Sequence, residues 1–175
     1  MSGVIVQVST SSGGVPKRAI EGGLLHASGF AGDGWDHPNI HGGRKQAALL
    51  ITVEGIEELA AQGFPVYPGA LGENLTTRGL DRRTIRIGQR YRVGSAVVEI
   101  TKVRLPCATM DVYGKGLQRA MFDARTLAGD TASPLWGLSG FYASVVTQGI
   151  VRLGEPIELI ATEPNRPDRR SPAFR

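Results

Sequence analysis

The chain contains one cysteine, Cys107, which follows a proline at the end of a run rich in β-branched residues. Because Pro106 has no backbone N–H to give to a sheet, we expect the strand to stop there and Cys107 to begin a loop. The basic side chains of Lys102 and Arg104 favour the thiolate form of the cysteine. A thiolate is a soft ligand that suits soft or high-valent metals. Cys107 is therefore a candidate metal ligand, and a small hydrophobe buried in the core is the alternative.

A second candidate site lies in a glycine-rich stretch between residues 32 and 45. It begins with Gly32-Asp33 and ends with His41-Gly42-Gly43-Arg44-Lys45. The backbone N–H groups of the glycine pair and the cationic side chains beside them can donate to a phosphate. The stretch contains neither a Walker pattern nor Gly-x-Gly-x-x-Gly, so it does not indicate a nucleotide-binding fold. A charged surface loop without a ligand fits the same residues.

A third candidate site is the stretch 68–75, in which two glycines are followed by Glu73 and Asn74. The glycines allow the backbone to bend sharply, so that polar side chains point inward or towards a ligand. The amide of Asn74 both donates and accepts hydrogen bonds and suits the edge of a heterocycle. The alternative is a tight turn in which Asn74 hydrogen bonds its own backbone.

The histidines suggest a different metal. His37 and His41 are four residues apart, which is a zinc-binding spacing when both lie on a helix. Pro38 and the glycines after His41 disfavour a helix at this place. A zinc-dependent hydrolase that uses His37, His41 and Cys107 is therefore a competing hypothesis without geometric support from the sequence.

Most of the segments that position these residues are predicted to be strands. Alternating or β-branched runs separated by turn residues predict strands at 3–9, 47–51, 84–87, 90–93, 96–103, 141–146 and 149–160, and an edge hairpin within 15–31. Gly94-Ser95 is a typical two-residue hairpin turn between two of them. Regular short strands with such turns predict a barrel or a strongly bent sheet.

Two helices complete the prediction. Apolar residues recur at helical spacing over 53–62, with Thr52 as the N-cap and Gly63 just past the end. The same spacing from Leu117 to Leu127 predicts a second helix, ended by Gly129. The βαβα alternation of a doubly wound fold is absent. The predicted fold class is therefore mostly β with a few helices, arranged as a barrel.

Composition and charge limit the class of protein. Glycine supplies 24 of the 175 residues, which predicts many tight turns. Much of the formal net charge of +4 comes from residues 165–175, which hold four arginines and one aspartate. Their proline and arginine content predicts a disordered basic tail over 163–175, after one domain at 1–162. We expect the partners to include no nucleic acid.

The remaining features favour a cytoplasmic protein. A lone cysteine forms no intrachain disulfide, as is usual in a reducing compartment. The N-terminus lacks the charged and apolar regions of a signal peptide. No apolar run approaches the roughly 18 residues that a membrane span requires. We therefore expect no membrane association.

Taken in order, these segments resemble the MOSC domain, the C-terminal domain of molybdenum cofactor sulfurases that also occurs as a free-standing bacterial protein. The resemblance covers roughly residues 3–160. The matching pieces are Gly32-Asp33, His41-Gly42-Gly43, Gly69, Gly72-Glu73-Asn74-Leu75, Gly79-Leu80, Ile87-Gly88, Val93-Gly94, Arg104-Leu105-Pro106-Cys107, Gly140-Phe141-Tyr142 and Gly149-x-Val151-x-x-Gly154. Each piece is short, and the ordered set that includes Pro-Cys carries the resemblance.

The resemblance implies a mostly-β barrel that binds Mo-molybdopterin, with Cys107 as the catalytic metal ligand. It also implies that Asp33, His41-Gly42-Gly43, Asn74 and Arg104 hold the pterin and its phosphate. Relatives are linked to the reduction of N-hydroxylated compounds, so the resemblance implies an oxidoreductase acting on a small molecule. Because no flavin, haem or iron–sulfur pattern is present, electrons would come from a partner reductase. A non-catalytic cofactor carrier or a sulfur-transfer module is the alternative.

Overall fold

The computed structural model describes residues 1–34 and 43–162. The strands are β1 (Ser2–Thr10), β2 (Arg18–Ile20), β3 (Gly22–His26), β4 (Gly29–Phe30), β5 (Ala48–Thr52), β6 (Leu75–Arg78), β7 (Gln89–Val93), β8 (Ala96–Val103), β9 (Phe141–Thr147), β10 (Gly149–Arg152) and β11 (Pro156–Thr162). The helices are α1 (Val53–Ala61), α2 (Leu117–Met121) and α3 (Ala124–Leu127), with 3₁₀ turns η1 (Arg44–Gln46), η2 (Arg82–Thr84) and η3 (Ala108–Tyr113). The predicted fold class, mostly β with a few helices, is confirmed.

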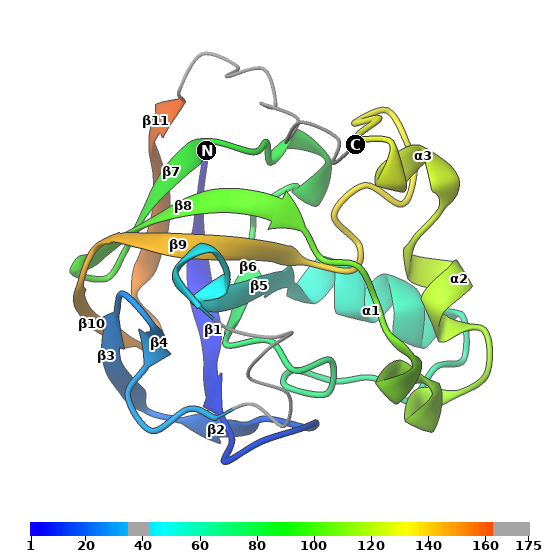
Figure 1. Cartoon of the computed structure of the whole chain (residues 1–175), viewed down its shortest axis with the longest axis horizontal. Coiled ribbons are helices and arrows are strands. Elements are labelled where there is room, and N and C mark those ends of the chain that lie inside the picture. The colour runs from blue at the N-terminus through cyan, green and yellow to red at the C-terminus, as the bar shows by residue number, and fades with distance from the viewer. Residues whose placement is uncertain (35–42, 163–175) are drawn as a thin grey trace, which may run out of the picture.

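The main sheet closes into a barrel (Figure 1). Its strand order is β11-β7-β8-β9-β5-β6-β1-β2, and β11 also pairs with β1, so the strands from β11 to β1 form a closed ring. Strands β5 and β6 are parallel, because α1 connects them, and the other neighbours in the ring are antiparallel. The barrel that the strand pattern predicted is therefore present.

The apolar residues form two clusters, one on each side of the sheet at β5. Ala48 and Leu50 belong to the cluster that fills the barrel, whereas Leu49 and Ile51 belong to the cluster beneath α1 and α2. A strand buried on both faces needs a continuous apolar run rather than an alternating one. This explains why the sequence of β5 is apolar throughout.

Helix α1 begins and ends close to the predicted residues. The side chain of Thr52 accepts a hydrogen bond from the backbone N–H of Gly55 at 3.2 Å, so Thr52 is the predicted N-cap. Ile56 and Leu59 are buried against the sheet. Gly63 follows with φ of 93°, a conformation that favours glycine after a helix end.

Two predicted elements differ in the structure. No strand forms at 84–87. Thr84 ends the 3₁₀ turn η2, which Asp81 caps by accepting from the backbone N–H of Arg83 at 3.0 Å, and the chain then turns at 87–88 before β7. The helix predicted from Leu117 to Leu127 is divided into α2 and α3. Phe122 is extended, and the side chain of Asp123 accepts from the backbone N–H of Thr126 at 2.7 Å. Local side-chain caps thus override the helical and strand periodicity.

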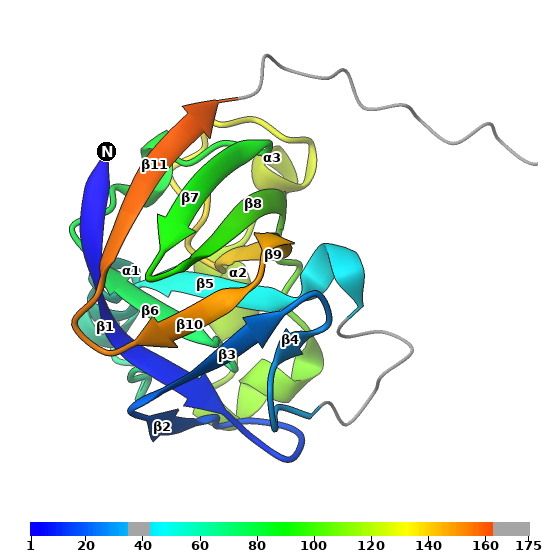
Figure 2. The same ribbon diagram turned by 90° about the vertical axis from the view of Figure 1, so that its left-hand side faces the viewer.

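The predicted terminal strand 149–160 is also divided. Strand β10 leaves the barrel and joins β3 and β4 in a three-stranded sheet, which lies beside the barrel in Figure 2. Gly154, with φ of 83°, lies in the turn before β11 returns to the barrel. The edge hairpin predicted within 15–31 corresponds to β2, β3 and β4.

No helix within residues 1–34 and 43–162 is long and apolar enough to cross a membrane. The predicted tail at 163–175 lies outside the described residues.

Candidate functional site

Cys107 lies just beyond the end of β8, as its sequence context predicts. The chain leaves the sheet after Arg104. The backbone N–H of Arg104 still donates to the carbonyl of Gly140, the residue before β9, at 2.9 Å. The Cys107 carbonyl then accepts from the backbone N–H of Met110 at 3.0 Å, which starts η3. Its side chain is half-buried, and its Sγ atom lies 2.8 Å from Oγ1 of Thr109. The thiol is therefore partly open to solvent and not sealed within the core.

Arg104 is buried beside this strand end, with 5% of its surface exposed. Its Nη2 atom donates to Sδ of Met110 at 3.2 Å, and its carbonyl accepts from Oγ of Ser139 at 2.7 Å. Its Nη1 atom is buried and has no hydrogen-bond partner within the described residues. A buried guanidinium with an unsatisfied donor is costly, so this atom is available to an anionic or carbonyl-bearing ligand.

Tyr142 connects Arg104 and Cys107 electrostatically. It lies on β9, opposite Lys102 of β8, whose Nζ atom is 5.2 Å from the centre of the Tyr142 ring. Burial raises the pKa of the Tyr142 hydroxyl and Cys107 acts in the same direction, whereas Arg104 acts in the opposite direction through its charge and a side-chain hydrogen bond. Tyr142 is accordingly protonated at neutral pH.

The structure brings Asp33 and Asn74 into contact, although they are far apart in the sequence. The Nδ2 atom of Asn74 donates to Oδ2 of Asp33 at 2.8 Å and to the carbonyl of Ser9 at 3.1 Å. Its Oδ1 atom accepts from the backbone N–H of Leu49 at 3.1 Å. Asn74 therefore links β1, β5 and Asp33, and it does not bond its own backbone through its side chain. Both of its polar atoms already have protein partners.

Lys17 completes this cluster and was not among the predicted site residues. Its ammonium forms an ion pair with Oδ2 of Asp33, and the two side chains are 7% and 1% exposed. The Oδ1 atom of Asp33 accepts from the backbone N–H of Ser11 at 2.9 Å. Burial lowers the pKa of Lys17, while Asp33 and Glu73 counteract this effect. A lysine within a predicted edge hairpin gives no sequence signal for such a pairing.

Glu73 links the two groups of residues; it belongs to the predicted candidate stretch 68–75, but the sequence assigned it no separate role. Its side chain is fully buried, with Oε1 accepting from the backbone N–H of Gly69 at 2.6 Å and from Oγ1 of Thr76 at 3.1 Å. Its Oε2 atom has no hydrogen-bond partner within the described residues. Glu73 interacts electrostatically with both Lys17 and Arg104. The 69–74 loop thus lies between the Asp33 cluster and the Cys107 end of the site.

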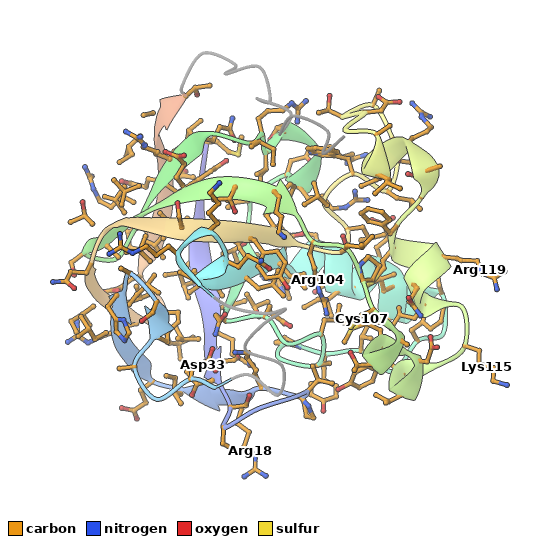
Figure 3. The ribbon with its side chains drawn as sticks, viewed as in Figure 1. Arg18, Asp33, Arg104, Cys107, Lys115 and Arg119 are labelled. Atoms are coloured by element: carbon orange, nitrogen blue, oxygen red, sulfur yellow. The ribbon has the colours of Figure 1, made fainter. Side chains whose placement is uncertain are left out.

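Figure 3 shows Asp33, Arg104 and Cys107 in the central part of the molecule, whereas Arg18 extends outward from its lower edge. Gly43, the last of the predicted phosphate-binding residues, has φ of 83° and precedes η1. His41 and Gly42 lie outside the described residues, and so does His37 of the zinc hypothesis. Within residues 1–34 and 43–162, no group of three His, Cys, Asp or Glu side chains could hold a metal ion.

The burial of Glu73 leads to a pH-dependent prediction. Burial raises the pKa of its carboxyl above the ordinary value of 4.5, although Gly69, Thr76 and Arg104 act in the opposite direction. The folded state therefore binds a proton that the unfolded state releases, so the unfolding free energy should fall as the pH rises from the unfolded pKa through the folded one. Glu73→Gln should flatten this fall, so the variant should be more stable relative to wild type at pH 8 than at pH 4.

Urea unfolding between pH 4 and pH 8 measures this difference. The matched control is Glu57→Gln, because the Glu57 side chain is 60% exposed and its loss should leave the slope unchanged. The charges that face Glu73 are those of Lys17 and Arg104, and Tyr113 also interacts with it. Parallel stability curves for Glu73→Gln and wild type would contradict the assignment.

Comparison with known proteins defines the class to which this barrel and strand-end cysteine belong. The model of the MOSC domain family matches residues 37–158. The chain therefore belongs to the MOSC domain family, which is associated with binding of the molybdenum cofactor.

Two curated bacterial proteins are similar to it. The uncharacterized protein YflK of Bacillus subtilis is 29% identical over 152 residues, which are 85% of this chain and 63% of YflK. Protein YiiM of Escherichia coli is 26% identical over 152 residues, which are 84% of this chain and 63% of YiiM. The matched part of the chain thus spans 63% of the length of these relatives.

Solved structures share the fold. YiiM from Geobacillus stearothermophilus superposes with a TM-score of 0.68 at 22% identity, over 91% of this chain and 75% of that one. YiiM from Escherichia coli superposes with a TM-score of 0.67 at 22% identity, over 94% and 72%.

Proposed function

We propose that this chain binds Mo-molybdopterin, with Cys107 as the protein ligand to molybdenum, and that it reduces N-hydroxylated small molecules with electrons from a partner reductase. One observation supports this above all. A half-buried lone thiol follows a strand end next to Arg104, whose buried guanidinium keeps a donor without a protein partner. A soft metal ligand and an unsatisfied cationic donor in adjacent positions suit a metal that is carried by an anionic organic cofactor.

The donor set of the site fits such a cofactor. Nη1 of Arg104 can donate to a pterin oxygen or to the phosphate. Such a hydrogen bond would remove the free-energy cost of burying this donor without a partner. Lys17 is buried in an ion pair with Asp33, so these two charges offset each other, and the raised pKa of Glu73 reduces the negative charge close to an anionic ligand. A single cysteine suffices, because the other sulfur ligands belong to the pterin.

The residues of the chain then have separate tasks. Cys107 would hold the metal, and Arg104 would orient the pterin. Asn74 and Asp33 are engaged with protein partners, so their task is to position the loop at 69–74. When bound, the cofactor supplies two-electron redox chemistry at the metal. Reduction of an N–OH group consumes two electrons and two protons and yields N–H and water.

The experiment is an assay of the holoprotein with an N-hydroxylated purine and dithionite-reduced methyl viologen as the electron donor. We expect stoichiometric formation of the amino purine, at a rate proportional to the molybdenum content. Holoprotein that carries molybdenum but leaves the purine unchanged would contradict the reductase and favour the cofactor carrier or the sulfur-transfer module.

A further inference from the structure

Large apolar side chains are exposed on both sides of Cys107 in the sequence. Leu105 is 63% exposed and Val112, on η3, is 71% exposed. Exposed apolar groups that gather near a functional residue are typical of contact surfaces, because their removal from water favours association. Leu105 lies two residues before Cys107 in the sequence, and Val112 lies five residues after it, on the 3₁₀ turn η3 that begins after Cys107.

Two unpaired cations follow Val112 in the chain. Lys115 and Arg119 are exposed and have no ion-pair or hydrogen-bond partner within the described residues. In Figure 3 both side chains extend outward from the edge of the molecule that lies beyond Cys107. They line a hollow of about 290 Å³ together with Asp111, Gly116 and Gln118. The carboxylate of Asp111 already accepts a hydrogen bond from Nε2 of Gln118 at 3.1 Å.

The charge of this segment differs from that of the rest of the barrel. Residues 102–119 contain four basic side chains and one acidic side chain. Several other exposed cations in the described residues are paired, for example Arg78 with Glu57 and Arg125 with Asp130. The segment that contains Cys107 therefore carries a formal net charge of +3.

We propose that Leu105, Val112, Lys115 and Arg119 form a docking face for an acidic electron-donor protein. This inference rests on the proposed function, which requires electrons from another protein. The donor must bring its redox group close to the metal that Cys107 would hold, and this face adjoins Cys107. An apolar centre with a charged rim is the usual composition of a transient interface. The unpaired cations favour a donor surface rich in Asp and Glu and accelerate its encounter.

The test compares two electron donors on the holoprotein. Reduced flavodoxin is the acidic protein probe, and dithionite-reduced methyl viologen is a small donor that needs no docking face. Lys115→Glu and Arg119→Glu, singly and together, should lower flavodoxin-driven turnover, by about tenfold for the double variant at low salt. The salt dependence of the rate should reverse in the double variant. Turnover with methyl viologen and the melting temperature should equal those of wild type.

Arg18→Glu is the matched control for each single variant. Arg18 is exposed, extends from a different edge of the molecule, and its replacement changes the net charge by the same amount. Flavodoxin-driven turnover of Arg18→Glu should remain within twofold of wild type.

The outcomes that would overturn the proposal are distinct. If flavodoxin fails to drive wild type, or drives all variants equally well, while methyl viologen supports turnover, the docking face is wrong and the proposed function stands. An equal loss in Arg18→Glu would assign the effect to overall charge. The wild type could instead bind labelled single-stranded DNA. If Lys115→Glu and Arg119→Glu abolish that binding but leave flavodoxin-driven turnover unchanged, the face is assigned to nucleic acid. Absence of turnover with methyl viologen would remove the proposed function and this inference together.

Discussion

Cys107→Ser should lose its molybdenum and its turnover while keeping the stability of wild type. A serine hydroxyl cannot replace a thiolate as a soft metal ligand. It can, however, keep the contact with Oγ1 of Thr109, where Sγ now lies at 2.8 Å, and the site is partly open to solvent. We therefore expect turnover at least about a hundredfold lower and molybdenum content at least about tenfold lower. Replacing a residue that only hydrogen bonds a metal ligand already lowers metal affinity or activity about 10- to 100-fold.

Metal analysis, turnover and thermal unfolding of the variant beside wild type measure these effects. Thr109→Ala is the control, because it removes the hydroxyl next to Sγ without removing the thiol, and it should retain molybdenum. If Cys107 were a core residue instead, the serine variant would be less stable, by about 1–3 kcal/mol, and its cofactor content would be intact. That second pattern would contradict the ligand assignment.

Asp33→Ala should destabilise the fold more than any other single change in the Lys17 cluster. It would leave the ammonium of Lys17 buried without its counter-ion. It would also remove the acceptor of the Ser11 backbone N–H and of one of the two N–H groups of the Asn74 amide, which keeps the carbonyl of Ser9. Breaking a buried ion pair by removing one partner costs about 3–5 kcal/mol. We expect a loss of that size in the unfolding free energy, measured by urea denaturation of the protein without cofactor.

The double variant Lys17→Met/Asp33→Ala separates charge burial from packing. Since it removes both charges, it should recover much of the stability that Asp33→Ala loses. If the double variant is no more stable than Asp33→Ala, the loss comes from the contacts of Asp33 with Ser11 and Asn74, and the ion pair contributes little. An Asp33→Ala variant as stable as wild type would contradict the buried pairing altogether.

The parts of the fold that depend on local signals could be predicted from the sequence. Strand β8 has the predicted bounds, 96–103, because an alternating pattern is framed by the Gly94-Ser95 turn and by Pro106. Helix α1 could be predicted from its cap and its apolar face. Two of the errors lie where a side-chain cap changes the backbone, at Asp81 and Asp123. Such caps are short and compete with periodicity over only a few residues.

The site could be predicted only in part, because its contacts join distant segments. Cys107 stands out by its place after a strand and a proline. The contact between Asp33 and Asn74 depends on barrel closure, and the burial of Lys17 and Glu73 depends on how the 69–74 loop packs. Residue types signal a charged group, but burial and pairing are tertiary properties that a single sequence does not display. His41 and Gly42 remain predictions, since they lie outside the described residues.

The metal content of wild-type protein purified from a host that makes molybdenum cofactor tests the central claim most directly. Elemental analysis of the monodisperse protein, combined with fluorescence of the oxidised pterin, should give about one molybdenum and one pterin per chain. Both should disappear together in protein from a host that lacks cofactor synthesis. Protein that carries neither, or that retains one zinc per chain in both hosts, would contradict the account and favour the zinc hypothesis based on His37, His41 and Cys107.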